Sequence, residues 1–166
     1  MTKDNTSITN NIPPEPSPAE PSGESNKKSS LIKEISFERT KVLIAEDNPV
    51  IRKGLINFLT KWGYEPIEAE TGDIAFQIVE SSPDLRLAVF DWNLPGISGM
   101  QLCQRIRSRT CEHYMYIIMF SSRKSEEEQI MALDGGADDY LVKPSKPSIL
   151  RARLGVGKRI VEFSGS

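Results

Sequence analysis

Five short apolar runs alternate with five amphipathic stretches between residues 41 and 163. The runs at 41–45, 87–90 and 115–120 are apolar almost throughout, as in strands that are buried on both faces of a parallel sheet. The run at 64–69 alternates and contains Pro66, which favours an edge strand. A fifth run covers 140–142. This alternation predicts an α/β fold, a doubly wound five-stranded parallel sheet built from five βα units.

Capping residues mark the helices between these runs. Four residues with side chains suited to an N-cap precede the first four helices: Asn48, Thr71, Ser98 and Ser125. Gly63 and the pair at 135–136 are predicted to end helices. The last helix is predicted over 147–163, although each of its two glycines costs about 1 kcal/mol. The apolar helix residues expected to face the core include Phe58, Ile74, Ile78, Val79, Leu102, Cys103, Ile106, Ile130, Leu133, Ile149, Leu150, Leu154 and Ile160.

Residues 1–38 differ in composition from the rest of the chain. Pro, Ser, Thr, Asn and Gly occupy 19 of the first 30 positions, and all twelve aromatic residues lie at position 37 or later. Such a segment buries too little apolar surface to offset its ordering entropy. We therefore predict a disordered Pro/Ser-rich tail at 1–38, one folded domain at 39–163 and a short C-terminal end at 164–166.

Charge and residue counts exclude several classes of function. The 21 Lys and Arg against 23 Asp and Glu give no basic face for nucleic acid. One His and two Cys are too few for His-based metal motifs, a disulfide framework or a Cys-only zinc site. No apolar run exceeds seven residues, so no membrane insertion is expected. Two unpaired thiols without a signal peptide favour a reducing, cytoplasmic location.

Polar residues stand at the carboxyl ends of the predicted strands. Glu46 and Asp47 follow the first run, and Asp91 follows the third. Ser121 follows the fourth run, and Lys143 follows the fifth. These ends meet at one edge of the sheet, where open α/β folds bind their ligands. Clustered carboxylates suit Mg²⁺, and a carboxylate can itself attack a phosphoryl group. We therefore predict Mg²⁺-dependent phosphoryl transfer to a carboxylate.

The segments VLIAEDN, VFDWNLPGISG, MFSS and GGADDYLVKP resemble the receiver domain of two-component response regulators, over about residues 41–160. The resemblance implies a flavodoxin-like fold with strand order 2-1-3-4-5. It also implies a signalling switch, rather than an enzyme, that takes a phosphoryl group from a sensor histidine kinase or a histidine phosphotransfer protein. The phosphorylated domain then changes conformation and regulates an output domain or a partner. A homodimer through the fourth helix, fifth strand and fifth helix is a further expectation.

The resemblance assigns a role to each residue that matches the family pattern. Asp91 matches the phosphoacceptor, and Glu46 and Asp47 match the acidic pair that binds Mg²⁺. Asn93 matches the residue whose backbone carbonyl completes the metal site.

The remaining matches concern the phosphoryl group and the switch. Ser121 matches the hydroxyl that bonds the phosphoryl group, and Lys143 matches the lysine that pairs with the phosphoaspartate. The peptide bond between Lys143 and Pro144 is cis in the family. Tyr140 matches the aromatic residue that turns inward on activation.

Three positions depart from the family pattern or add to it. Ser145 replaces the aromatic residue that usually follows Lys-Pro, which predicts a looser loop. Trp92 is bulky and is expected to shield Asp91. Arg123 lies two residues after Ser121, where family side chains influence how a hydrolytic water reaches the phosphoryl group. We predict that a cation there lengthens the phosphorylated lifetime.

Two other functions compete with a phosphorylated switch. A haloacid-dehalogenase-type phosphatase also uses a strand-end Asp, Mg²⁺ and a lysine, but it needs a second Asp where this chain has Asn93. A phosphorylation-independent interaction module commonly loses acidic or lysine positions that this chain retains. The final helix is similar to those of receivers that precede diguanylate cyclase or phosphatase domains. The chain is therefore interpreted as an excised receiver, with a natural stop as the alternative.

Overall fold

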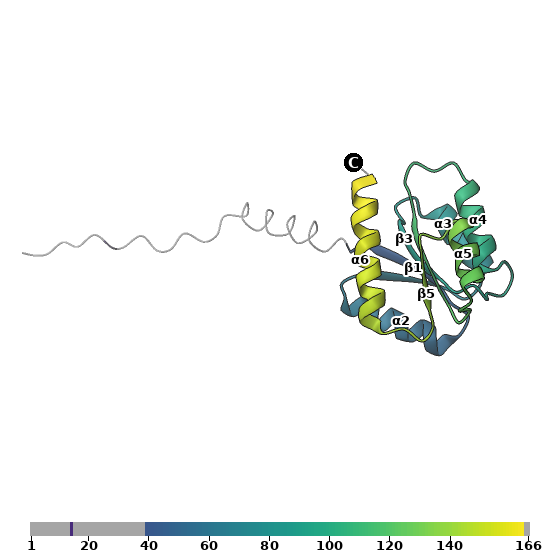
Figure 1. Cartoon of the computed structure of the whole chain (residues 1–166). Helices are drawn as coiled ribbons and strands as arrows, with labels where there is room; N and C mark the ends of the chain where they lie inside the picture. Colours follow the sequence, from purple (N-terminus) through teal and green to yellow (C-terminus); the bar gives the residue numbers. More distant parts are fainter. Residues whose placement is uncertain (1–13, 15–38, 165–166) are drawn as a thin grey trace, which may run out of the picture. The chain divides into compact units, whose positions relative to one another are not determined.

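The computed structural model describes Pro14 and residues 39–164 (Figure 1). The tail predicted at 1–38 therefore lies outside the described residues, apart from Pro14. Within residues 39–164, strands and helices alternate along the chain as predicted. The elements are β1 (Lys41–Ala45), α2 (Pro49–Lys61), β2 (Glu65–Ala69), α3 (Gly72–Ser81), β3 (Leu87–Phe90), α4 (Gly99–Ser108), β4 (Tyr116–Ser121), α5 (Glu126–Asp134), β5 (Asp139–Val142) and α6 (Pro147–Ser164).

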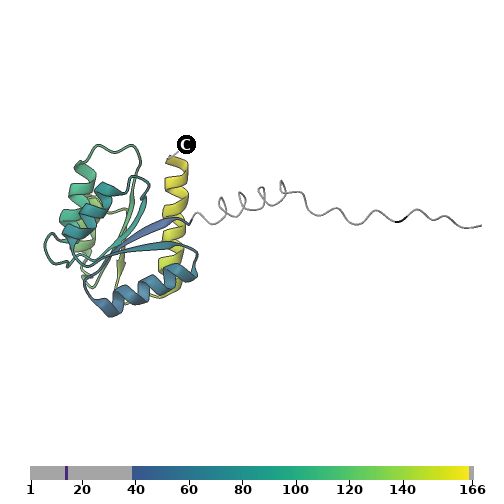
Figure 2. The ribbon, with the colours of Figure 1, turned by 180° about the vertical axis from the view of Figure 1, so that it is seen from behind.

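The strands form one parallel sheet in the order β2-β1-β3-β4-β5. Helices α2 and α6 cover one face of this sheet, and α3, α4 and α5 cover the other, as the two opposite views show (Figures 1 and 2). The predicted doubly wound, flavodoxin-like fold is thereby confirmed. The order reverses between β1 and β3, so the carboxyl ends of these two neighbouring strands border the crevice where such folds bind ligands.

The central strands are apolar throughout because each one contributes to two cores. In β1, Val42 and Ile44 pack with α2 and α6. Leu43 and Ala45 face the opposite way and pack with the residues of α3, α4 and α5. All four side chains are almost fully buried. This two-sided burial explains why the strand lacks the apolar–polar alternation of a half-exposed sheet.

Strand β2 lies at one edge of the sheet and pairs with β1 alone. Pro66 stands opposite Val42 in this pairing, and Glu65 and Glu68 are exposed on the same strand. Proline has no N–H for a second neighbouring strand, so it is tolerated at an edge. The prediction of an edge strand at this run is confirmed.

The predicted caps hold the helix starts in place. The side chain of Asn48 accepts hydrogen bonds from the backbone N–H groups of Val50 and Ile51 at 2.9 and 3.3 Å. Thr71, Ser98 and Ser125 cap α3, α4 and α5 in the same way. Gly63 and Gly136 have φ values of 89° and 120°, which favour glycine after a helix end.

Several apolar residues predicted to face the core are exposed instead. On α5, Ile130 and Leu133 are 51% and 45% exposed, and Ala132 is the buried position. This helix packs beside the edge strand β5, so the sheet covers a narrow strip of its surface. The same correction applies to four residues on the flanks of the other helices: Phe58, Ile74, Ile149 and Ile160.

Helix α6 continues to Ser164, one residue beyond the predicted end, in spite of its two glycines. Gly157 is buried, and a Cβ atom at this position would lie 2.4 Å from the ring of Tyr116. Gly155 faces open space. One glycine is therefore required by close packing, and the other is not. Across the described ranges, no helix combines the length and the apolar character that a membrane span requires.

Candidate functional site

Three carboxylates meet at the carboxyl end of the sheet, as their strand-end positions predicted. Glu46 and Asp47 follow β1, and Asp91 follows the neighbouring strand β3. The N–H of Asp91 donates to the carbonyl of Ala45 at 2.9 Å, which carries the pairing of the two strands into the site. Carboxylate oxygens of the three acids lie within 4.8 Å of one another. Glu46 is buried, Asp91 is partly buried and Asp47 is exposed.

Lys143 reaches this cluster from the end of β5. Its Nζ atom lies 2.6 Å from Oε2 of Glu46 and 2.9 Å from Oδ2 of Asp91. The peptide bond between Lys143 and Pro144 is cis, as the resemblance implied. The N–H of Lys143 donates to the carbonyl of Ser121 at 2.8 Å, which ties the ends of β4 and β5 together. One ammonium group thus bridges two carboxylates that come from different strands.

Burial and charge act against each other in this bridge. Burial raises the pKa of Glu46, and the nearby charge of Asp91 adds to this rise, whereas the contact with Lys143 opposes it. Burial alone would lower the pKa of Lys143, but its hydrogen bonds to Glu46 and Asp91 outweigh burial and raise it. Lys143 is therefore a charged ammonium at neutral pH. A permanent positive charge faces Asp91.

The donor set fits a hard divalent cation. Glu46, Asp47 and Asp91 offer carboxylate oxygens, and no His or Cys belongs to this group. Carboxylate oxygens are suitable ligands for Mg²⁺, which proteins usually bind through one or two carboxylates, water molecules and a substrate phosphate. Asn93 lies beside the group, since its N–H donates to Oδ1 of Asp91 at 3.2 Å. These residues would hold the ion.

Ser121 and Tyr140 meet at the loop that follows β4. Ser121 is fully buried, and its Oγ accepts a hydrogen bond from the N–H of Arg123 at 3.2 Å. Tyr140 is also buried, and its hydroxyl donates to the carbonyl of Arg123 at 2.5 Å. The side chain of Tyr140 therefore faces inward in this structure. The backbone of Arg123 connects the two residues that the resemblance singled out.

The side chain of Arg123 contacts Asn93, which lies two residues after Asp91. Its Nη2 and Nε atoms donate to Oδ1 of Asn93 at 2.8 and 3.2 Å, and Nη1 donates to Glu128 at 3.1 Å. The guanidinium lies over the ring of Trp92, 4.7 Å from its centroid. Trp92 itself is 7% exposed. Trp92 is therefore a buried ring that packs beneath the guanidinium of Arg123.

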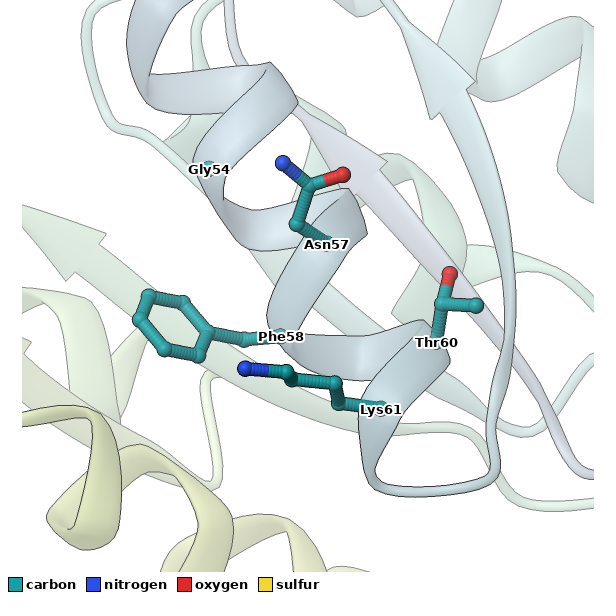
Figure 3. A pocket seen from close by; sticks show the side chains of 5 residues that line it. All are labelled: Gly54, Asn57, Phe58, Thr60 and Lys61. Carbon is teal, nitrogen blue, oxygen red and sulfur yellow. The ribbon is translucent and has the colours of Figure 1, made fainter.

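A separate open hollow lies on α2, as Figure 3 shows. Gly54, Asn57, Phe58, Thr60 and Lys61 line it. None of the strand-end residues belongs to this hollow, so it is not part of the candidate site.

Comparisons with known proteins identify the family of this chain. The family model of the response regulator receiver domain matches residues 42–155. The chain is 33% identical over 117 residues to the chemotaxis protein CheY1 of Helicobacter pylori. That alignment covers 70% of this chain and 94% of CheY1. It is 37% identical over 115 residues to the phosphate regulon transcriptional regulatory protein PhoB of Escherichia coli. That alignment covers 69% of this chain and 49% of PhoB.

Solved structures give the same result. The BeF3-activated N-terminal receiver domain of Klebsiella pneumoniae RstA superposes with a TM-score of 0.65 at 29% identity, covering 70% of this chain and 97% of that one. The receiver domain of Francisella response regulator 1452 superposes with a TM-score of 0.68 at 28% identity. The superposition covers 74% of this chain and 99% of that one. A response regulator/GGDEF domain protein gives 0.70 at 26% identity, covering 78% of this chain and 52% of that protein.

The chain belongs to the family of response regulator receiver domains. Receiver domains are switch modules of two-component signalling, and those of the CheY and PhoB type are phosphorylated by histidine kinases or phosphotransfer proteins. Membership is consistent with a phosphorylation-activated switch. A haloacid-dehalogenase-type phosphatase and a phosphorylation-independent module are not favoured.

Proposed function

We propose that Asp91 accepts a phosphoryl group from the phosphohistidine of a sensor kinase or a phosphotransfer protein. Mg²⁺ would be held by Glu46, Asp47, Asp91 and the backbone carbonyl of Asn93. The observation that carries the proposal is the convergence of three carboxylates with the ammonium of Lys143, 2.9 Å from Asp91. An output domain or partner would then respond to the phosphorylated form.

The transfer is a displacement at phosphorus. A carboxylate oxygen of Asp91 forms a bond to the phosphorus, the phosphorus–nitrogen bond breaks, and the imidazole nitrogen of the donor keeps the electron pair. Mg²⁺, when bound, supplies positive charge to the phosphoryl oxygens. Lys143 offsets the negative charge that builds up beside Asp91.

The switch would run through the loop after β4. If Ser121 Oγ turns to a phosphoryl oxygen, its contact with the N–H of Arg123 changes. The carbonyl of the same Arg123 receives the hydroxyl of Tyr140. Movement at Ser121 is therefore passed to Tyr140 through one residue. Such coupling shifts the population between two conformers.

Labelling with a small phosphodonor tests the proposal. The chain is incubated with phosphoramidate and MgCl₂, and its intact mass is measured. We expect one phosphoryl group per chain, and no labelling when EDTA is present from the start or when Asp91 is replaced in Asp91→Asn. Asp134→Asn, an exposed acid on α5, is the matched control and should be labelled like the wild type. A folded wild-type chain that stays unlabelled would overturn the proposal.

The surface of α5, β5 and α6 supports a proposed homodimer. Ile130, Met131 and Leu133 expose apolar side chains on α5. Light scattering with and without beryllofluoride and Mg²⁺ should show an increase in mass on activation. An unchanged mass would remove the dimer from the proposal.

The location and the extent of the domain are part of the same proposal. Cys103 and Cys111 are both free, which supports a reducing, cytoplasmic compartment. The elements from β1 to α6 support a receiver over 39–163. Fractionation with a compartment marker tests the first point, and limited proteolysis tests the second.

A further inference from the structure

Arg52 occupies an unexpected place for a cation. It lies in the first turn of α2, directly after the loop that carries the acidic pair. A positive charge is unfavourable near a helix N-terminus, and α2 has no acidic residue in that turn to offset it. The side chain is 11% exposed, so water does not solvate it freely. Specific contacts must hold it there.

These contacts are to the backbone of the metal-site loop. Nη1 of Arg52 donates to the carbonyl oxygen of Glu46 at 2.9 Å and to that of Asp47 at 3.4 Å. On its other side, Nη2 lies 3.4 Å from Glu70, and Nε lies 4.0 Å from Glu68. The guanidinium thus connects the turn after β1 to the neighbouring strand β2 and the residue that follows it. Its planar fork suits several simultaneous acceptors.

We propose that Arg52 is a positioning residue for Mg²⁺ binding. It holds two consecutive carbonyls and so fixes the backbone from which the side chains of Glu46 and Asp47 reach the ion. The inference rests on the proposed metal site. Glu46 has other anchors, because Lys143 and the N–H of Asn48 also contact its carboxylate. Asp47 is exposed, and its orientation depends on the backbone of the turn.

The sign of the effect separates positioning from electrostatics. The charge of Arg52 repels a cation that binds at the adjacent carboxylates. If charge alone mattered, neutralising Arg52 would tighten Mg²⁺ binding. If Arg52 positions the turn, neutralising it weakens binding, because Mg²⁺ demands near-ideal octahedral geometry.

Calorimetric titration of the unphosphorylated chain with MgCl₂ measures this directly. We expect the dissociation constant of Arg52→Gln to rise about tenfold, as for other residues that orient metal ligands. Arg52→Lys keeps the charge but loses the planar fork, so its affinity should fall in between. Lys53→Gln is the matched control, since it removes an exposed charge from the next residue of the same helix. Its affinity should equal or slightly exceed that of the wild type.

Each outcome decides a different point. If Arg52→Gln binds Mg²⁺ as tightly as the wild type, or more tightly, the inference about Arg52 is wrong, but the proposed metal site still stands. A wild type that binds no Mg²⁺ overturns the metal site and the inference with it. Circular dichroism without Mg²⁺ checks that each variant is folded. If Arg52→Gln is unfolded, Arg52→Lys decides, and an unchanged affinity there overturns the inference.

Discussion

Arg123 connects Ser121 and Tyr140 to Asn93 at the edge of the carboxylate site. Its N–H reaches Ser121, its carbonyl receives Tyr140, and its guanidinium joins Asn93 and Glu128 over Trp92. The guanidinium is thus held on Asn93, whose own N–H contacts the carboxylate of Asp91. The predicted effect of a cation on the phosphorylated lifetime therefore has a structural basis in a held, rather than a free, guanidinium.

Arg123→Ala should lose its phosphoryl group faster than the wild type. A barrier lower by about 1 kcal/mol, the scale of an exposed ion pair, corresponds to about a fivefold shorter lifetime. Loss of label after removal of the phosphodonor measures the rate. Lys124→Ala, the exposed neighbour, should behave like the wild type. Faster loss from the wild type than from Arg123→Ala would contradict the prediction.

The two cysteines should differ sharply in reactivity. Burial raises the pKa of Cys103 to about 12, so its reactive thiolate is scarce at pH 8. Cys111 is exposed. We expect Ellman's reagent to detect one thiol per native chain and two after denaturation. Cys111→Ser should show none in the native state, and a prompt reaction there would mean that Cys103 is accessible.

Among the elements, α6 gives a matched pair of substitutions. Gly155→Ala should stabilise the chain by about 1 kcal/mol, because the methyl group meets open space and alanine favours the helix. Gly157→Ala should destabilise it by about 1–3 kcal/mol, because the methyl group meets the ring of Tyr116 at 2.4 Å. Urea unfolding of both variants gives the two free energies. Equal effects of the same sign would contradict the packing described for α6.

Element positions were predictable from the sequence because they depend on local chemistry. The bounds of β1 and β3 follow from continuous apolar runs, and the helix starts follow from side chains such as Asn48 and Ser98. Which side chains of α5 are buried was not predictable in this way. Periodicity identifies an apolar stripe, but it does not say how much of the stripe an edge strand can cover, and Ile130 and Leu133 stay exposed.

The site was predictable in part for the same reason. Residues at strand ends converge in any parallel sheet, so Asp91 and Lys143 could be placed together from sequence. The contacts of Arg123 with Asn93, and of Arg52 with Glu70, join residues that are distant in sequence or have no fixed spacing. No local pattern signals such pairs. They depend on the tertiary fold, which brings the two side chains together.

For the whole molecule, Mg²⁺ should act as a stabilising ligand. An ion that binds the native state alone stabilises it by about 2.7 kcal/mol at a concentration 100 times its dissociation constant. Asp47→Asn should keep the stability of the metal-free chain within about 0.5 kcal/mol, since Asp47 is exposed. It should lose most of the Mg²⁺-dependent rise in melting temperature. An undiminished rise in this variant would exclude Asp47 as a ligand.

The edge strand β2 has a consequence for folding. A parallel sheet assembles slowly, because its strands are joined only after long connections close, and its open edge can recruit another copy meanwhile. On β2 that edge carries Pro66, which lacks an N–H, between the exposed carboxylates of Glu65 and Glu68. Strand-to-strand association is therefore opposed on this side by the missing donor at Pro66 and by charge repulsion. The sequence that marks this strand as an edge also protects the chain from aggregation while it folds.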